Sequence, residues 1–105
     1  MVQNININKA NLDEFEIFDV RCPFEWKEGV LENAKLVCLY DDRGFLNENF
    51  INEFKEKLEN NKKIAFVCKA GQRSFTAAKM VEENLNLDSV NLDGGMSSYK
   101  GKLKK

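Results

Sequence analysis

The stretch FVCKAGQRSF, residues 66 to 75, places a cysteine at the end of an apolar run and just before a helical pattern. A tight turn that contains a glycine can direct several backbone N–H groups toward one point and bind an anion there. The positive end of the following helix dipole favours negative charge at the same point. We expect Ser74 to cap that helix. Cys68 is therefore either a thiolate nucleophile or a small buried residue of the core.

The segment around Cys68 is more basic than the rest of the chain. Between residues 62 and 81 there are five basic residues and no acidic ones, whereas the whole chain has a formal net charge of −1. A cysteine beside cations or at a helix N-terminus ionises more easily than a free thiol. Because the chain contains no histidine, a Cys–His dyad is excluded, and local positive charge is the remaining way to keep this sulfur ionised.

The other cysteines indicate the setting of the protein. Cys22, Cys38 and Cys68 are an odd number, spaced 16 and 30 residues apart, which argues against a disulfide framework and favours a reducing, cytoplasmic environment. Without close cysteine pairs or histidine, we expect no metal ion. Cys38, inside KLVCLY, is expected to be a core residue. Cys22 is either a resolving thiol for Cys68 or an incidental small residue before Pro23.

Length and composition predict one globular domain over residues 1–105. The chain has 43% hydrophobic and 31% charged residues, which is ordinary for such a domain. Its N-terminus lacks the basic and apolar regions of a signal peptide, and no apolar run is long enough to span a membrane. The small net charge gives no reason to expect nucleic acid or a membrane surface as a partner. The oligomeric state cannot be inferred from the sequence.

Short apolar segments alternate with amphipathic ones along the chain. Strands are predicted at 15–20, 35–40, 63–68 and 89–92, and helices at 23–29, 49–60 and 74–85. This alternation predicts an α/β fold with a central, mainly parallel sheet of about four to five strands and helices on both faces. Ligands of such folds bind at the carboxyl ends of strands. Cys68 and Asp19-Val20-Arg21 both lie at such ends.

Three segments resemble, in order and spacing, the signature of single-domain rhodaneses. They are IFDVRCPFEWKEGVLENA, FVCKAGQRSFTAAKMV and VNLDGGMSSYKG. The resemblance covers about residues 15 to 101 and leaves 102–105 as a frayed tail. It implies a rhodanese-like fold and a sulfurtransferase that needs no cofactor. Cys68 would take sulfane sulfur from an anionic donor such as thiosulfate, become a persulfide, and pass the sulfur to a thiol, a protein cysteine or cyanide.

The resemblance also implies roles for the residues around Cys68. The residues that would bind the substrate are Lys69, Ala70, Gly71, Gln72 and Arg73. Their backbone amides would stabilise the persulfide anion, while the side chains of Lys69 and Arg73 would attract the donor. The supporting residues would be Asp19, Arg21 and Ser74. Asp19 would accept hydrogen bonds that hold the active loop, and Arg21 would fix the surrounding ion pairs. The glycines Gly94 and Gly95 would permit positive φ and close approach to the loop.

Two other functions fit the same fold. Related domains act on phosphate or arsenate with a longer loop, whose arginine stands six positions after the cysteine. Here Arg73 is five positions after Cys68, and a shorter loop suits a single sulfur atom better than a tetrahedral oxyanion. Rhodanese-like domains that lack the cysteine serve as non-catalytic interaction modules, a role that the presence of Cys68 argues against. The short stretch NKANLDEF replaces the usual first helix, which leaves either an open sheet edge for a partner or a minimal domain.

Overall fold

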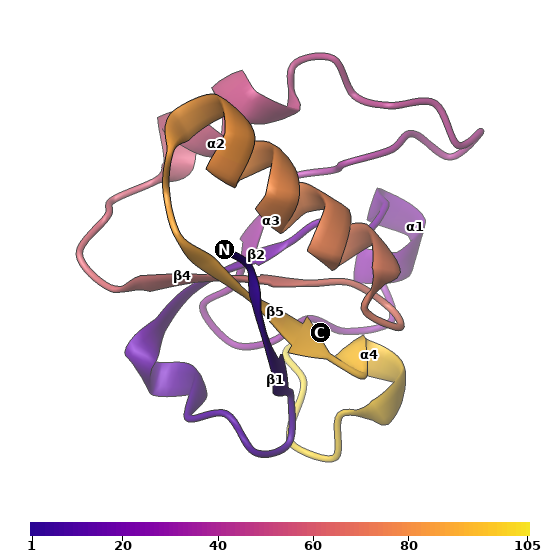
Figure 1. The fold of residues 1–105 in the computed structure, drawn as a ribbon. Coiled ribbons are helices and arrows are strands. Elements are labelled where there is room, and N and C mark those ends of the chain that lie inside the picture. Colours follow the sequence, from indigo (N-terminus) through magenta and orange to yellow (C-terminus); the bar gives the residue numbers. More distant parts are fainter.

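The computed structural model describes residues 1–105 and contains one parallel sheet between two layers of helices and loops (Figure 1). The strands are β1 Gln3–Asn6, β2 Phe15–Asp19, β3 Lys35–Leu36, β4 Lys63–Val67 and β5 Ser89–Asp93. They lie in the order β1-β5-β4-β2-β3, and every neighbouring pair is parallel. The helices are the 3-10 helix η1 Leu12–Glu14 and the α-helices α1 Pro23–Trp26, α2 Phe50–Lys57, α3 Gln72–Leu85 and α4 Gly95–Ser98. The predicted α/β fold is confirmed.

Strand β4 lies at the centre of the sheet and supplies side chains to both faces. Ile64 and Phe66 belong to the core beneath α2 and α3, whereas Ala65 and Val67 belong to the core on the opposite face. This alternation follows from the period of two residues along a strand. Because β4 is apolar on both faces, it is buried between the layers, and the residue that follows it emerges at the middle of the sheet edge.

Four aromatic rings fill the core under α2 and α3. Phe18, Phe50, Phe54 and Phe66 are fully buried, and their neighbouring ring centroids lie 4.6 to 6.4 Å apart. The spacing of Phe50 and Phe54 by one helical turn places both rings on the buried face of α2. This cluster fixes α2 and α3 against the strands that carry the loop residues.

Three elements, β1, α4 and the 3-10 helix η1, were not predicted from the sequence, and one predicted strand is shorter than expected. Strand β1 pairs with β5 at the sheet edge, although its sequence, QNIN, is mostly polar. Helix α4 has only four residues after two glycines. The strand expected at 35–40 contains only β3, because beyond Leu36 the pairing with β2 continues as single hydrogen bonds from Val37 and Leu39.

The two ends of the chain are both engaged. Strand β1 pairs with β5 at one edge of the sheet, so of the two alternatives for the short N-terminal stretch, an open sheet edge and a minimal domain, the second describes the edge beside β5. At the other end, Lys104 exchanges two backbone hydrogen bonds with Val30, at 2.9 and 2.8 Å. The expectation of a frayed tail over 102–105 is therefore wrong for Lys104, since an antiparallel bridge holds it. No helix is both long and apolar enough to cross a membrane.

We expect Phe54→Ala to lower the free energy of unfolding by about 3–5 kcal/mol, because it leaves a cavity among three other rings. Urea denaturation followed by circular dichroism measures this change. The matched control is Phe45→Ala, at a phenylalanine that is 63% exposed, where a change within about 0.5 kcal/mol is expected. Equal losses in the two variants would contradict the assignment of Phe54 to the core.

Candidate functional site

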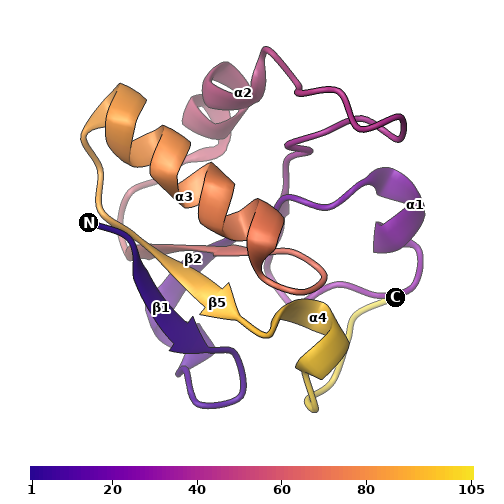
Figure 2. The same ribbon diagram turned by 45° about the vertical axis from the view of Figure 1, so that its right-hand side comes forward.

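The predicted loop lies at the carboxyl end of β4, where Cys68 follows the strand directly. Gly71 has a φ of +114° and precedes the first residue of α3, so the chain turns from strand to helix within four residues. The carboxyl ends of β2 and β5 flank this turn. Figures 1 and 2 show the loop beside α4, with α1 on the same side of the molecule.

The sulfur of Cys68 is buried and hydrogen-bonded. The residue is 1% exposed, and its Sγ accepts a hydrogen bond from the amide of Gly71, with an N···S distance of 3.1 Å. The backbone amides of Lys69, Ala70, Gln72 and Arg73 form no hydrogen bond within the protein. Of the five amides predicted to bind the substrate, that of Gly71 thus donates to the sulfur. The other four have no acceptor in the protein and can donate to an atom of a bound anion.

Helix α4 holds the backbone of the loop from behind. The amides of Met96 and Ser97 donate to the carbonyl oxygens of Cys68 and Lys69, at 2.8 and 2.9 Å. In a trans peptide the C=O and the following N–H point in opposite directions, so these bonds turn the amides of Lys69 and Ala70 away from α4. A Cβ atom at Gly95 would lie 2.5 Å from both of those carbonyl oxygens, which explains why the predicted close approach requires glycine.

The guanidinium of Arg73 is paired with a carboxylate of α1. Its two terminal nitrogens donate to Oε1 and Oε2 of Glu25 at 2.8 and 2.9 Å. Glu25 also accepts from the amide of Cys22 at 3.0 Å. The hydrogen bonds from Arg73, against the opposing effect of burial, lower the pKa of Glu25 to about 2, and the same pair raises the pKa of Arg73. The side chain of Lys69, which is exposed, therefore remains as the unpaired positive charge of the loop.

Asp19 and Arg21 form a buried pair next to the loop. Arg21 donates to both carboxylate oxygens of Asp19, at 2.8 to 3.1 Å, and to the carbonyl oxygens of Gly29 and Glu25 at 2.8 and 3.4 Å. Asp19 was expected to accept hydrogen bonds from the loop, but its partners are the side chain and amide of Arg21. The pair thus fixes α1, and acts on the loop only through Glu25 and Arg73.

Ser74 occupies a different position from the one predicted. It is the third residue of α3, which begins at Gln72, and Gly71 stands at the N-cap. The hydroxyl of Ser74 is fully buried and lies 3.2 Å from Sγ of Cys68 and 2.5 Å from Oδ1 of Asn91. Asn91 was not predicted as a site residue. The signal that could have identified it is its place as a polar residue in the middle of a short apolar strand.

The two remaining cysteines are less suited to nucleophilic chemistry. Cys22 is buried, its Sγ donates to the carbonyl oxygen of Tyr40 at 3.4 Å, and burial and the charge of Glu25 raise its pKa. Cys38, expected in the core, is only half-buried, and burial also raises its pKa. All three cysteines are free thiols, and no cluster of three or more side chains could hold a metal ion.

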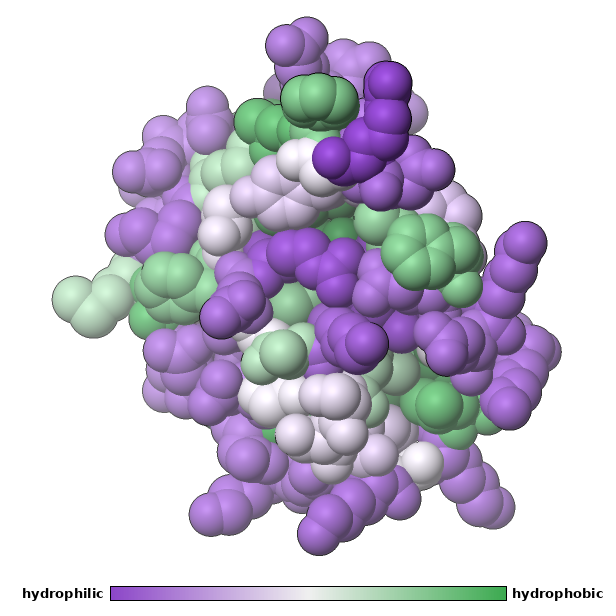
Figure 3. Space-filling model, turned by 90° about the vertical axis from the view of Figure 1, so that its right-hand side faces the viewer, coloured by the Kyte–Doolittle hydropathy of each residue, from purple (hydrophilic) through white to green (hydrophobic).

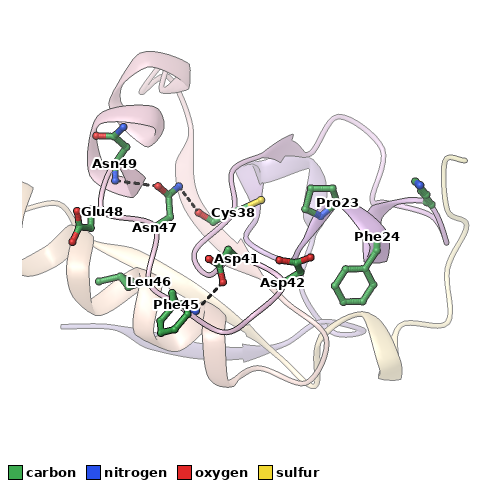
Figure 4. A pocket seen from close by; sticks show the side chains of 11 residues that line it. Pro23, Phe24, Cys38, Asp41, Asp42, Phe45, Leu46, Asn47, Glu48 and Asn49 are labelled. Carbon is green, nitrogen blue, oxygen red and sulfur yellow. Dashed lines mark hydrogen bonds between the residues drawn. The ribbon is translucent and has the colours of Figure 1, made fainter.

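An open hollow lies between α1 and the loop after β3 (Figure 4). Phe24 stands on one side of it and Phe45 and Leu46 on the other, with Asp41 and Asp42 between them. An adjoining hollow extends to the loop residues Lys69, Gln72 and Arg73. Figure 3, which faces this side of the molecule, shows separate hydrophobic patches around hydrophilic residues. The approach to the loop is therefore bordered by apolar and acidic groups.

Comparisons with known proteins agree with one another. The model of the family "Rhodanese-like domain" matches residues 4–102. The chain is 30% identical over 92 residues to the Bacillus subtilis (strain 168) protein named "Putative sulfurtransferase YtwF", which covers 88% of this chain and 80% of that one. The crystal structure of Rv0390 from M. tuberculosis is similar in fold, with a TM-score of 0.78, 24% identity and coverage of 97% of this chain and 83% of that chain. A rhodanese-like domain protein from Staphylococcus aureus has a TM-score of 0.73 and 24% identity, over 98% and 99% of the two chains.

Gly95→Ala should displace the loop, because the new Cβ would meet two carbonyl oxygens at 2.5 Å. We expect the free energy of unfolding to fall by about 2–5 kcal/mol and the rate of Cys68 alkylation to change. The control is Gly44→Ala, which has a φ of +89° but no atom within 4 Å of its Cβ. It should lower stability by about 1–2 kcal/mol and leave alkylation unaltered. Unaltered alkylation in Gly95→Ala would contradict the role of α4 as the support of the loop.

The ion pair of Glu25 predicts a dependence of stability on pH. The pKa of Glu25 is about 2 in the folded protein against 4.5 for the unperturbed group. Stabilisation from this pair is therefore complete above pH 4.5 and is lost as the pH falls from 4.5 toward 2. Glu25→Gln should lower the free energy of unfolding at pH 7 by about 1–3 kcal/mol and flatten the curve below pH 4.5. If the free energy of unfolding of Glu25→Gln falls below pH 4.5 with the same slope as that of the unsubstituted protein, then protonation of Glu25 does not cause the loss of stability.

Proposed function

Because the chain belongs to the family of rhodanese-like domains, we propose that it is a sulfurtransferase in which Cys68 carries the transferred sulfur. The observation that carries this proposal is the arrangement of the loop, where one buried sulfur lies beside a set of amides with no partner in the protein. A persulfide needs such a set, since its charge resides on the terminal sulfur. Cys68 is the catalytic residue, and the loop residues 69–73 form the binding site.

The first half-reaction is the loading of Cys68. Its thiolate attacks the outer sulfur of an anionic donor such as thiosulfate, and the S–S bond of the donor breaks, with the electron pair leaving on sulfite. Sulfite needs no proton, so the absence of histidine is no obstacle. The terminal sulfur of the new persulfide lies among the free amides, which stabilise its charge. The exposed ammonium of Lys69 attracts the donor, whereas the side chain of Arg73 is committed to Glu25.

The second half-reaction returns the thiolate. A nucleophile, either cyanide or the thiolate of a small molecule or protein, attacks the terminal sulfur, and the bond between the two sulfurs of the persulfide breaks toward Sγ of Cys68. No cofactor is needed, since both steps exchange sulfur between nucleophiles. Three free cysteines support a reducing compartment, the cytoplasm, as the place of action.

A second candidate is a non-catalytic interaction module. The observation in its favour is the 1% exposure of Cys68, which would suit a residue that only packs. A phosphate- or arsenate-directed enzyme is less well supported, because the guanidinium that would bind the oxyanion is occupied by Glu25.

Incubation with thiosulfate should increase the intact mass of the protein by one sulfur, about 32 Da, and cyanide should reverse the gain. Peptide mapping should place the added sulfur on Cys68. The variant Cys68→Ser should gain no mass, while Cys22→Ser and Cys38→Ser should load normally. An unsubstituted protein that gains no sulfur would favour the interaction module, and turnover of thiosulfate and cyanide by Cys68→Ser would contradict the assignment of the nucleophile.

A further inference from the structure

The hydroxyl of Ser74 lies between two polar atoms that compete for its single proton. Sγ of Cys68 is 3.2 Å from Oγ of Ser74, and Oδ1 of Asn91 is 2.5 Å from it. The three residues are 0 to 2% exposed, so bulk water does not contribute a hydrogen bond. A serine hydroxyl donates one hydrogen bond and accepts others through its lone pairs. It can therefore donate to Cys68 or to Asn91, but not to both.

The amide orientation of Asn91 is fixed by its other partners. Its Nδ2 donates to the carbonyl oxygen of Gly71 at 3.1 Å and to Oδ1 of Asn4 at 2.9 Å. A carbonyl oxygen only accepts, so the amide cannot be turned over, and Oδ1 of Asn91 must face Ser74 as an acceptor. The hydroxyl of Ser74 then donates to Oδ1 of Asn91. In the contact between Cys68 and Ser74, the donor is therefore the thiol of Cys68 and the acceptor is Oγ of Ser74.

From this pattern we infer that Asn91 is a positioning residue that acts through Ser74 to disfavour the free thiolate of Cys68 relative to both the thiol and the persulfide. The thiolate needs the proton of Ser74, which would leave the buried Oδ1 of Asn91 without a donor. In the persulfide, Sγ bears neither a proton nor the formal charge, so Ser74 keeps its bond to Asn91. The inference about the persulfide rests on the proposed function; the inference about the thiolate does not.

This arrangement favours retention of a bound sulfur. Sulfite can reverse loading: its sulfur lone pair attacks the terminal sulfur of the persulfide, a new S–S bond forms thiosulfate, and the Cys68 S–S bond breaks with its electron pair on Sγ. Cys–S–S⁻ and SO₃²⁻ thus give Cys–S⁻ and S₂O₃²⁻, with no proton or outside oxidant. Because Asn91 makes the emptied thiolate less stable, it shifts this equilibrium toward the persulfide.

The first test measures alkylation of Cys68 by iodoacetamide at neutral pH, with no sulfur donor present. Asn91→Leu should react about five- to thirtyfold faster than the unsubstituted protein, a factor that corresponds to one hydrogen bond. Ser74→Ala should react more slowly than the unsubstituted protein, and Asn91→Leu should have no effect in the Ser74→Ala background. Cys22 and Cys38, followed in the same peptide map, report any general loosening of the fold.

The second test measures the loaded fraction by intact mass in mixtures of thiosulfate and sulfite. At a pH on the plateau of the alkylation rate, where the emptied Cys68 is thiolate in both proteins, Asn91→Leu should need a thiosulfate-to-sulfite ratio about five- to thirtyfold higher for half-loading. Damage to the loop would also expose Cys68 and weaken loading, but it would accelerate alkylation equally in the Ser74→Ala background, where the inference expects no effect of Asn91→Leu. If Asn91→Leu does not fold, as judged by circular dichroism, Asn91→Ala serves in both tests.

Three results would overturn the inference: alkylation of the Asn91 variant at or below the unsubstituted rate at neutral pH, an equal acceleration in the Ser74→Ala background, or an unchanged loading ratio at the pH of the alkylation plateau. Failure of the proposed function would give a different result. The unsubstituted protein would then gain no sulfur from thiosulfate, whereas the alkylation rates of the Asn91→Leu and Ser74→Ala variants could still change as expected.

Discussion

The hydrogen bonds from Met96 and Ser97 to the carbonyl oxygens of Cys68 and Lys69 are the constraint on which the site depends. A loop of this length has as many carbonyls as amides, and only the amides suit an anion. By binding two carbonyls, α4 determines which way the intervening peptide groups face. The glycine at position 95 exists for this contact, since any side chain would occupy the space of the carbonyls. The orientation of the loop amides is thus set by residues that follow two strands, β4 and β5, and not by the loop alone.

Most of the charged side chains around the loop are paired with one another and hold the fold together, so few are left to attract a ligand. The segment from 62 to 81 is basic in the sequence, yet Arg73 is bound to Glu25, which comes from another part of the chain. The buried carboxylate of Asp19 is likewise matched by Arg21. What remains beside the loop is Lys69, near a hollow that contains Asp41 and Asp42. For the proposed anionic donor, one ammonium and the backbone dipoles are therefore the source of attraction, and long-range steering contributes little.

Local patterns were sufficient to predict the sheet, the main helices and the loop, because each depends on apolar periodicity or on residues adjacent in sequence. Residues 69 to 71 follow Cys68 after the end of β4, and residues 72 and 73 begin α3. What the sequence could not indicate were partners chosen by tertiary contacts. The pairing of Arg73 with Glu25 joins residues 48 positions apart, and β1 becomes a strand only because β5 offers an edge. Ser74 is the buried third residue of α3 and not its cap, because Gly71, three residues before it, occupies the N-cap position.

If Cys68 carries sulfur as we propose, the burial of its Sγ limits which reactants can reach it. With Cys68 1% exposed, a donor that is narrow at its sulfur end reaches Sγ most easily. Once loaded, the reactive atom is the terminal sulfur, which lies about 2 Å further along the S–S bond and is the atom that an acceptor meets. The requirement for access is therefore stricter in loading than in unloading. A donor has to be narrow at its sulfur end, whereas an acceptor can be as large as a protein that presents a cysteine at the hollow beside the loop.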